Sequence, residues 1–185
     1  DAHLVSILNE AMRLSREGVY AESTQKQNQF RAEAFSKVEE AISVGPDYFE
    51  CHRIAGWLYS MSRNNVKAAE HYDLALKLNY NYPPLLLFAG NFYYKSGVDF
   101  NKSLQLLGDA LKLDPEHLPT KVEIAMCKRH MDDCIGAFKA FSELDGNLMR
   151  EKCNTKEYTV WLSSYIGTLV NCFHISNIYI FSLFY

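Results

Sequence analysis

Residues 75–79 read Ala-Leu-Lys-Leu-Asn and residues 110–114 read Ala-Leu-Lys-Leu-Asp, so almost the same five residues recur 35 positions along the chain. A weaker copy, Ala-Ile-Ser-Val at residues 41–44, stands 34 positions before the first. A second set of small and aromatic residues, N-terminal to these copies, repeats with the same period. It consists of Gly56 and Tyr59, then Gly90 and Tyr93, then Ala125. Because this period is that of a two-helix unit, the sequence predicts an array of helical hairpins.

Within one repeat, small and large residues alternate in the order expected where two helices approach each other closely. In the second repeat these residues are Gly56, Tyr59, Ala68, Tyr72 and Ala75; in the third they are Gly90, Tyr93, Gly97, Ser103, Leu107 and Ala110, followed by Pro115. On these residues the sequence resembles the tetratricopeptide repeat (TPR) family, over roughly residues 2–145. The resemblance implies an all-α fold, a right-handed superhelical array of about four helix-turn-helix hairpins.

The sequence departs from the repeat pattern at three places, and each departure predicts a structural feature. Between Ala11 and Ala34 the spacing is longer than in the central repeats, so an insertion is expected near residues 19–29, as a loop or as extra helical turns. The third repeat has one extra residue, which we place in the turn at residues 96–99. In the fourth repeat Leu144 occupies a position where a small residue is usual, so this hairpin is expected to be splayed.

The composition changes after residue 145. Aromatic and aliphatic residues at helical spacing predict a C-terminal capping helix within residues 146–169: Tyr158, Trp161, Leu162, Tyr165, Ile166 and Leu169. Such a cap covers the apolar face that a terminal repeat would otherwise expose. Residues 170–185 form an uncharged, hydrophobic tail for which three alternatives stay open: a buried capping segment, a membrane tail anchor, or a tail foreign to the array.

Charge and cysteine content exclude several classes of protein. The formal net charge is −3, too near neutral for a surface that follows a nucleic-acid backbone. The five cysteines are scattered and form no CxxC pair, so neither a secreted disulfide scaffold nor a zinc ribbon fits, and a cytoplasmic location is predicted. The chain begins at Asp1 and shows no signal-peptide pattern, so we expect a piece of a longer protein.

No catalytic residue, cofactor site or metal site is predicted. The sequence contains no Gly-rich phosphate loop, no GxSxG and no HExxH. Cys127, His130 and Cys134 have a spacing that would bring them near one face of an uninterrupted helix, but only three ligands are present and the helix is expected to end near residues 131–133. We interpret these three residues as packing residues.

The resemblance also implies where a partner binds, because the first helix of each TPR hairpin lines a concave groove that holds peptides or helices. The positions that correspond to this groove are Glu50, Arg53, Trp57, Ser60, Leu87, Asn91, Tyr94, Val122, Met126 and Arg129. Trp57 is the predicted aromatic anchor, although it could instead be wedged against the neighbouring repeat. Arg53 and Arg129 are predicted to orient acidic groups of the partner.

One specific type of TPR partner is not expected. TPR domains that hold the acidic carboxyl terminus of Hsp70 or Hsp90 chaperones use a clamp of Lys, Asn and Arg residues, and the corresponding positions here carry Arg53, Trp57, Phe88, Pro119 and Glu123. Only Arg53 has suitable chemistry, and Glu123 would repel a carboxylate. The sequence therefore predicts a non-enzymatic scaffold for an unidentified protein or peptide. One alternative is a sensor or assembly module of a larger multidomain enzyme. The other is a tail-anchored membrane adaptor, which is possible but not favoured.

Overall fold

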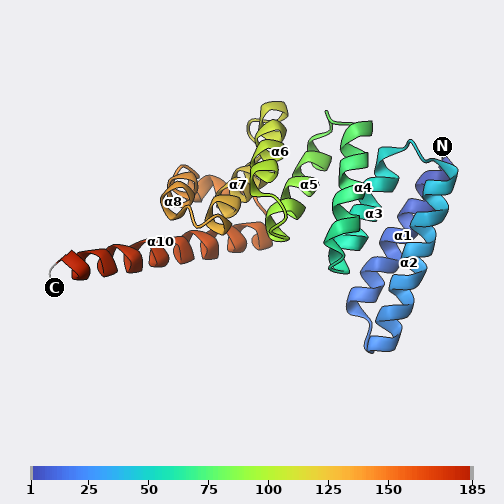
Figure 1. Cartoon of the computed structure of the whole chain (residues 1–185), viewed down its shortest axis with the longest axis horizontal. Coiled ribbons are helices and arrows are strands. Elements are labelled where there is room, and N and C mark those ends of the chain that lie inside the picture. Colours follow the sequence, from blue (N-terminus) through green and yellow to red (C-terminus); the bar gives the residue numbers. More distant parts are fainter. Residues whose placement is uncertain (1, 184–185) are drawn as a thin grey trace. The chain divides into compact units, whose positions relative to one another are not determined.

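The protein is all-α throughout the part of the chain described by the computed structural model, which covers the backbone of residues 2–183 and the side chains of residues 2–172 (Figure 1). Within that part, ten helices follow one another without a strand: α1 (Ala2–Tyr20), α2 (Thr24–Val44), α3 (Phe49–Met61), α4 (Asn65–Leu78), α5 (Pro83–Lys95), α6 (Phe100–Leu113), α7 (Leu118–His130), α8 (Cys134–Ser142), α9 (Gly146–Lys152) and α10 (Thr155–Leu183). The predicted all-α hairpin array is confirmed.

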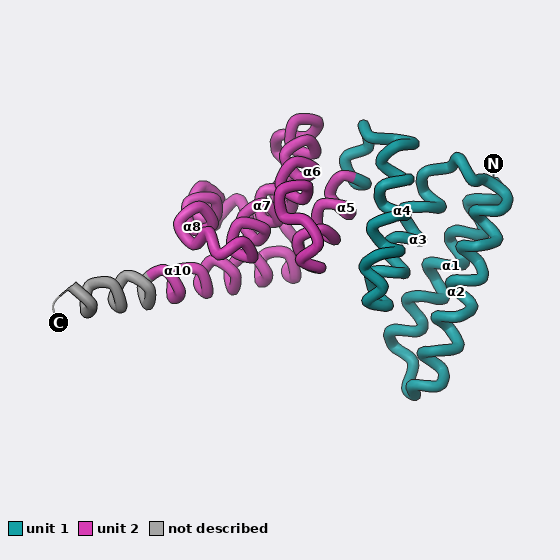
Figure 2. The backbone as a smooth tube through the Cα atoms, viewed as in Figure 1, with its two compact units in different colours: residues 1–85 teal, residues 86–185 magenta. Residues whose placement is uncertain are grey.

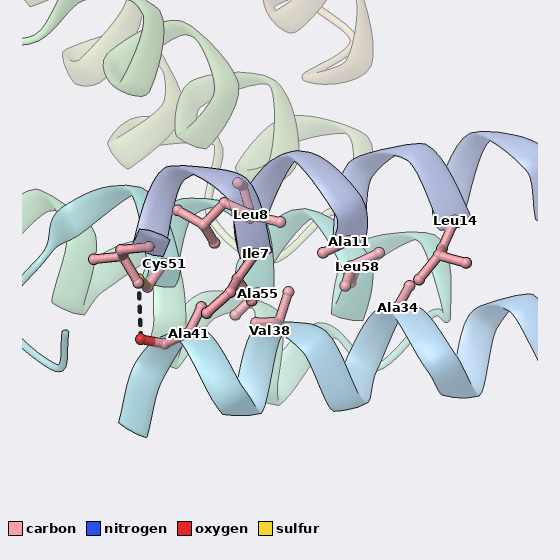
Figure 3. Close-up of a cluster of buried hydrophobic side chains, with 12 residues drawn as sticks. Ile7, Leu8, Ala11, Leu14, Ala34, Val38, Ala41, Cys51, Ala55 and Leu58 are labelled. Atoms are coloured by element: carbon pink, nitrogen blue, oxygen red, sulfur yellow. Dashed lines mark hydrogen bonds between the residues drawn. The ribbon is translucent and has the colours of Figure 1, made fainter. Parts of the chain in front are cut away.

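The chain divides into two compact units, residues 1–85 (unit 1) and residues 86–185 (unit 2), which Figure 2 distinguishes by colour. Each unit has its own buried side chains. In unit 1 the core joins α1, α2 and α3, and Figure 3 shows it with the Cys51 Sγ donating to the Ala41 carbonyl oxygen over 3.6 Å. Its members are Leu4, Ile7, Leu8, Ala11, Leu14, Ala34, Val38, Ala41, Cys51, Ile54, Ala55 and Leu58.

The second helix of each hairpin begins with a capping side chain. These caps are Ser23, Asn64, Asp99 and Asp133, and each accepts a hydrogen bond from a backbone N–H in the first turn of its helix. Such caps satisfy donors that have no partner inside the helix, which is why short polar residues mark these four helix starts.

The connections within the hairpins follow the expected lengths. Residues 62–64 join α3 to α4 and residues 131–133 join α7 to α8, whereas residues 96–99 join α5 to α6. The extra residue of the third repeat therefore lies in the turn, as predicted, and Gly97 adopts the left-handed conformation there with φ +70°. In the segment 19–29, α1 runs to Tyr20 and α2 starts at Thr24, so helical turns occupy most of it.

The small residues lie at the helix contacts that the repeat pattern predicted. In unit 1, a Cβ atom at Gly56 would lie 3.0 Å from the ring of the buried Tyr72 on α4. In unit 2, a Cβ atom at Gly90 would lie 2.8 Å from Leu107 Cγ on α6, and the Ser103 hydroxyl donates to the Gly90 carbonyl oxygen over 2.8 Å. Both contacts leave no room for a side chain, which explains the glycine at each position.

At the C-terminal end, two helices occupy the segment in which the sequence predicted one capping helix. Asp145 caps α9, and after a short turn α10 packs against α8. Leu144, expected to splay the fourth hairpin, is buried in the core of this region. That core contains Leu118, Val122, Ala125, Phe141, Leu144, Met149 and Trp161.

The hydrophobic tail lies mostly outside the described side chains, which end at residue 172, so the three alternatives for residues 170–185 stay predictions. Among the described residues, no helix combines the length and apolar character needed to cross a membrane.

The structure contains one disulfide that the sequence analysis did not predict. Cys134 at the start of α8 and Cys172 on α10 form a disulfide with a Cα–Cα distance of 6.0 Å, although 38 residues separate them in sequence. Because sequence spacing carries no information on such a distant contact, the scattered cysteines did not reveal it.

Candidate partner-binding surface

The four predicted groove residues of unit 1 all lie on α3, and three of them are occupied by contacts within the unit. The Arg53 Nε atom donates to Glu50 Oε2 over 2.8 Å, and their side chains are only 14% and 18% exposed. The Ser60 hydroxyl donates to the Trp57 carbonyl oxygen over 2.7 Å. Because its charge is already neutralised by Glu50, Arg53 is a poor ligand for an acidic group of a partner.

Trp57 is partly buried and packs against the core of unit 1. Its indole therefore contributes to the packing of α3, while part of its surface stays open. The structure thus gives Trp57 a structural contact in addition to the predicted role as an anchor.

The six predicted groove residues of unit 2 come from α5 and α7. Tyr94 is 1% exposed and Val122 is 6% exposed, so their side chains lie in the interior of the unit rather than on its surface. Leu87 and Met126 are partly exposed and pack against the same buried cluster, which contains Tyr94, Leu107 and Cys127. Leu87 of α5 and Met126 of α7 therefore lie at the same buried cluster.

Tyr94 connects α5 to α7. Its hydroxyl donates to the Glu123 carboxylate, and its ring lies edge-on to His130 with the centroids 5.1 Å apart. Burial, together with the negative charge of Glu123, raises the pKa of Tyr94 and keeps the phenol protonated. Lys95 Nζ lies 3.6 Å from the second oxygen of Glu123, so this carboxylate is held between two partners. The sequence identified Glu123 only as a residue that would repel an acidic ligand.

Asn91 has an unsatisfied hydrogen-bonding atom. Its side chain is partly exposed, but the Oδ1 atom is buried and accepts no hydrogen bond from any described residue. A buried acceptor without a donor costs about 1–3 kcal/mol.

Arg129 differs from Arg53 in having no carboxylate partner. Its guanidinium lies against α10, where a Cβ atom at Gly167 would be 3.4 Å from one of its terminal nitrogens. It makes no hydrogen bond or ion pair within residues 2–172. A partly buried guanidinium without an anion favours the binding of a carboxylate. The sequence analysis did not predict the contact between Arg129 and α10, because Arg129 and Gly167 are 38 positions apart and no sequence pattern links them.

We define the unit 2 surface as Leu87, Asn91, Met126 and Arg129. Two hollows of this unit lie elsewhere: one of about 410 Å³ between α6, α7, α8 and α9, and one of about 430 Å³ beside α9. Neither hollow is lined by a residue of the unit 2 surface.

The described residues contain no group of three or more His, Cys, Asp or Glu side chains arranged for a metal ion. Of the three residues weighed as ligands in the sequence, Cys134 is bonded to Cys172. The Cys127 thiol donates to the Phe100 carbonyl oxygen over 3.7 Å, and His130 Nδ1 lies 2.9 Å from the Met126 carbonyl oxygen. Each side chain therefore has its own separate partner.

Comparison with known proteins gives a clear result for the fold. A scan against protein-family models and a search of curated proteins both found no match. Among solved structures, yeast Tom70 matches with a TM-score of 0.65 and 19% identity over 89% of this chain and 33% of that chain. An O-GlcNAc transferase mutant of Thermobaculum terrenum matches with a TM-score of 0.64 and 17% identity over 81% of this chain and 26% of the transferase.

A third similar structure is the first TPR of Spaghetti (RPAP3) bound to an HSP90 peptide, with a TM-score of 0.51 and 16% identity. The match covers 67% of this chain and 94% of that chain. This chain therefore spans about a quarter of the transferase and a third of Tom70, but nearly the whole of the RPAP3 domain. The chain thus has the fold of the tetratricopeptide-repeat proteins, the family that its sequence repeats resemble.

Proposed function

We propose that this chain is a non-enzymatic protein-interaction scaffold, and that the unit 2 surface holds an extended segment of a partner protein. The observation that carries the proposal is the Arg129 guanidinium on α7, which is partly exposed and has no carboxylate partner among the described residues. The side chain of Asn91 on α5, the preceding first helix, is also partly exposed. Leu87 and Met126 supply partly exposed apolar surface on the same two helices.

The two polar groups complement different parts of a peptide. An asparagine side-chain amide donates hydrogen bonds through its nitrogen, which can pair with the C=O groups that an extended backbone presents. An arginine guanidinium pairs best with a carboxylate, in a two-bond arrangement. A segment with an acidic side chain and an apolar side chain therefore fits the unit 2 surface.

The RPAP3 domain shares this fold and is bound to an HSP90 peptide in its structure. In this chain Glu123, the predicted obstacle to a chaperone tail of that type, already accepts a hydrogen bond from Tyr94 and pairs with Lys95, so it is the remaining clamp positions that disfavour such a tail. Arg53, the one clamp position with suitable chemistry, is engaged by Glu50. We therefore propose a partner other than an acidic chaperone tail.

A second candidate function is favoured by the match to the transferase. Because this chain covers only 26% of that enzyme's chain, a helical array of this kind also occurs as one part of a larger enzyme, and a sensor or assembly module stays a proposal. A cytoplasmic location likewise stays a prediction of the sequence.

Panning a random peptide-display library on the full chain tests the scaffold proposal. The selected peptides are expected to lose about 30-fold in affinity, or about 2 kcal/mol, for an Asn91→Ala, Met126→Ala double variant, because both central contacts are removed. Val66→Ala is the control, since Val66 is 71% exposed on α4 and lies outside the predicted groove. Fluorescence anisotropy of labelled peptides measures the affinities. Equal affinity for wild type and a folded double variant would remove the unit 2 surface as the binding site.

The two arginines of the predicted groove provide a second, sharper test. For a selected peptide with an acidic residue, Arg129→Met is expected to weaken binding about tenfold, since the free guanidinium is lost. Arg53→Met is expected to leave the affinity unchanged, because Glu50 already neutralises Arg53. Isothermal titration calorimetry of both variants with the acidic peptide and its amide analogue gives the comparison. A larger effect at Arg53 than at Arg129 contradicts this assignment.

A further inference from the structure

We propose that Cys134 and Cys172 form a reversible redox site, a dithiol/disulfide pair that fastens α10 to α8. The proposal goes beyond the scaffold function and does not rest on it. Its starting point is the disulfide itself, whose Cα–Cα distance of 6.0 Å lies in the ordinary range for such a bond. Both cysteines are partly exposed, so a soluble thiol or disulfide can reach the bond.

The disulfide continues the packed contact between α8 and α10. Phe138 and Phe141 on α8 both lie against the ring of Tyr165 on α10, with centroid distances of 6.0 and 6.1 Å. Cys134 stands about one turn before Phe138 on α8, and Cys172 stands two turns after Tyr165 on α10. The two helices therefore run antiparallel at this contact, and the disulfide marks its end within the described side chains.

The surroundings of the two sulfur atoms also suit the reduced form. Cys172 Sγ lies 3.3 Å from the Cys134 carbonyl oxygen, and Cys134 Sγ lies 3.8 Å from the Thr168 carbonyl oxygen. After reduction, each S–H group thus has an acceptor within reach without a change in the backbone. Both redox states fit one local structure, which is what a reversible site requires.

The other three cysteines are poorly placed to compete for an oxidant. Cys51 and Cys127 are 0% exposed, and burial raises the pKa of both thiols. Burial, together with the charge of Glu157, also raises the pKa of Cys153. Because the thiolate is the reactive form, these three cysteines react slowly. Cys134 and Cys172, by contrast, are partly exposed and are placed within bonding distance of each other.

The redox step is a thiol–disulfide exchange with a low-molecular-weight disulfide such as oxidised glutathione. One cysteine thiolate attacks the glutathione disulfide and releases one glutathione, and the second cysteine then attacks the mixed disulfide and releases the other. The two protein thiols lose two protons and two electrons, and glutathione disulfide becomes two glutathione thiols. A dithiol reductant reverses the step. In the predicted cytoplasmic location such a disulfide would be transient, as redox-sensing disulfides there are.

The consequence of reduction is local. The disulfide closes a loop over the 38 residues between its cysteines and so restricts how far α10 moves from α8. Gly167, against which Arg129 rests, lies little more than one turn before Cys172 on α10. Loss of the bond therefore loosens the part of α10 that covers Arg129, while the contacts of α5 and α6 are untouched.

The test compares the full chain after equilibration with oxidised glutathione and with dithiothreitol. Alkylation and mass spectrometry are expected to find two fewer free thiols after oxidation, with Cys134 and Cys172 in one linked peptide. Hydrogen exchange is expected to be at least about tenfold faster in residues 165–172 of the reduced chain, while α5 and α6 exchange equally in both states. Cys153→Ser is expected to keep this redox response, and Cys172→Ser is expected to behave like the reduced wild type in both conditions.

Two results overturn the proposal. If Cys134 and Cys172 stay fully alkylated after oxidation, there is no redox site at this position. If the bond forms but exchange of residues 165–172 is the same in both states, the pair does not control α10. Since wild-type protein is compared with itself in two redox states, the second result is decisive even if Cys172→Ser does not fold.

Discussion

Replacing Trp161 with alanine is expected to lower the free energy of unfolding of unit 2 by about 3–5 kcal/mol. Trp161 is 5% exposed and contacts Tyr158 and Tyr165 on its own helix, with ring centroids 5.6 and 5.9 Å apart. A Cβ atom at Gly146 would lie 3.2 Å from the indole, so Trp161 also joins α10 to α9. Its removal leaves a cavity where α10 meets α9.

A second substitution separates the packing of the indole from its polar atom. Trp161 Nε1 is buried and has no hydrogen-bond acceptor among the described residues. Trp161→Phe keeps most of the ring contacts and removes this unsatisfied donor, so it is expected to destabilise the unit by about 1–2 kcal/mol, clearly less than Trp161→Ala.

Urea denaturation followed by circular dichroism at 222 nm measures these differences. Val170→Ala is the matched control, because Val170 lies on the same helix and is 60% exposed, and its effect is expected to stay within about 0.5 kcal/mol. If Trp161→Ala and Val170→Ala unfold at the same urea concentration, α10 does not cap the fourth hairpin through Trp161.

Leucine in place of Gly90 is expected to lower the stability of unit 2 by about 3 kcal/mol or more, the upper end of the usual effect of overpacking. A Cβ atom at this position already falls 2.8 and 2.9 Å from two atoms of Leu107, which is 0% exposed and has nowhere to move. The helices α5 and α6 must therefore separate, which also threatens the hydrogen bond from Ser103 to the Gly90 carbonyl oxygen.

Gly108→Leu provides the control for this experiment within the same unit. Gly108 also lies inside a helix, but a Cβ atom there would meet nothing within 4 Å. Since leucine favours a helix more than glycine does, this substitution is expected to be neutral or to stabilise by up to about 1 kcal/mol. Thermal unfolding by circular dichroism compares the two variants. Similar melting temperatures for Gly90→Leu and Gly108→Leu would show that the close contact of α5 and α6 is misplaced.

Much of the candidate site depended on information that a sequence pattern lacks. Leu87 and Met126, which the groove spacing assigned to two successive first helices, both pack against one buried cluster, since that spacing reflects helix periodicity. It could not distinguish a surface residue from a buried one, and Tyr94 proved to be bonded to Glu123, 29 residues away. Nor could it distinguish Arg53 from Arg129, because the availability of each guanidinium to a partner depends on whether a carboxylate lies nearby in space.

Helical hairpins, their turns and their close contacts were readable from the repeats, because the contacts of Gly56 with Tyr72 and of Gly90 with Leu107 join residues within one repeat. A period of 34–35 residues records such short-range contacts each time it recurs. The contact of Arg129 with Gly167 and the bond of Cys134 to Cys172 each join residues 38 positions apart, and the second partner lies beyond the last repeat. The repeat of 34–35 residues does not extend to α10. The position of α10 on α7 and α8 therefore follows from burial of its aromatic face, which only folding of the chain brings about.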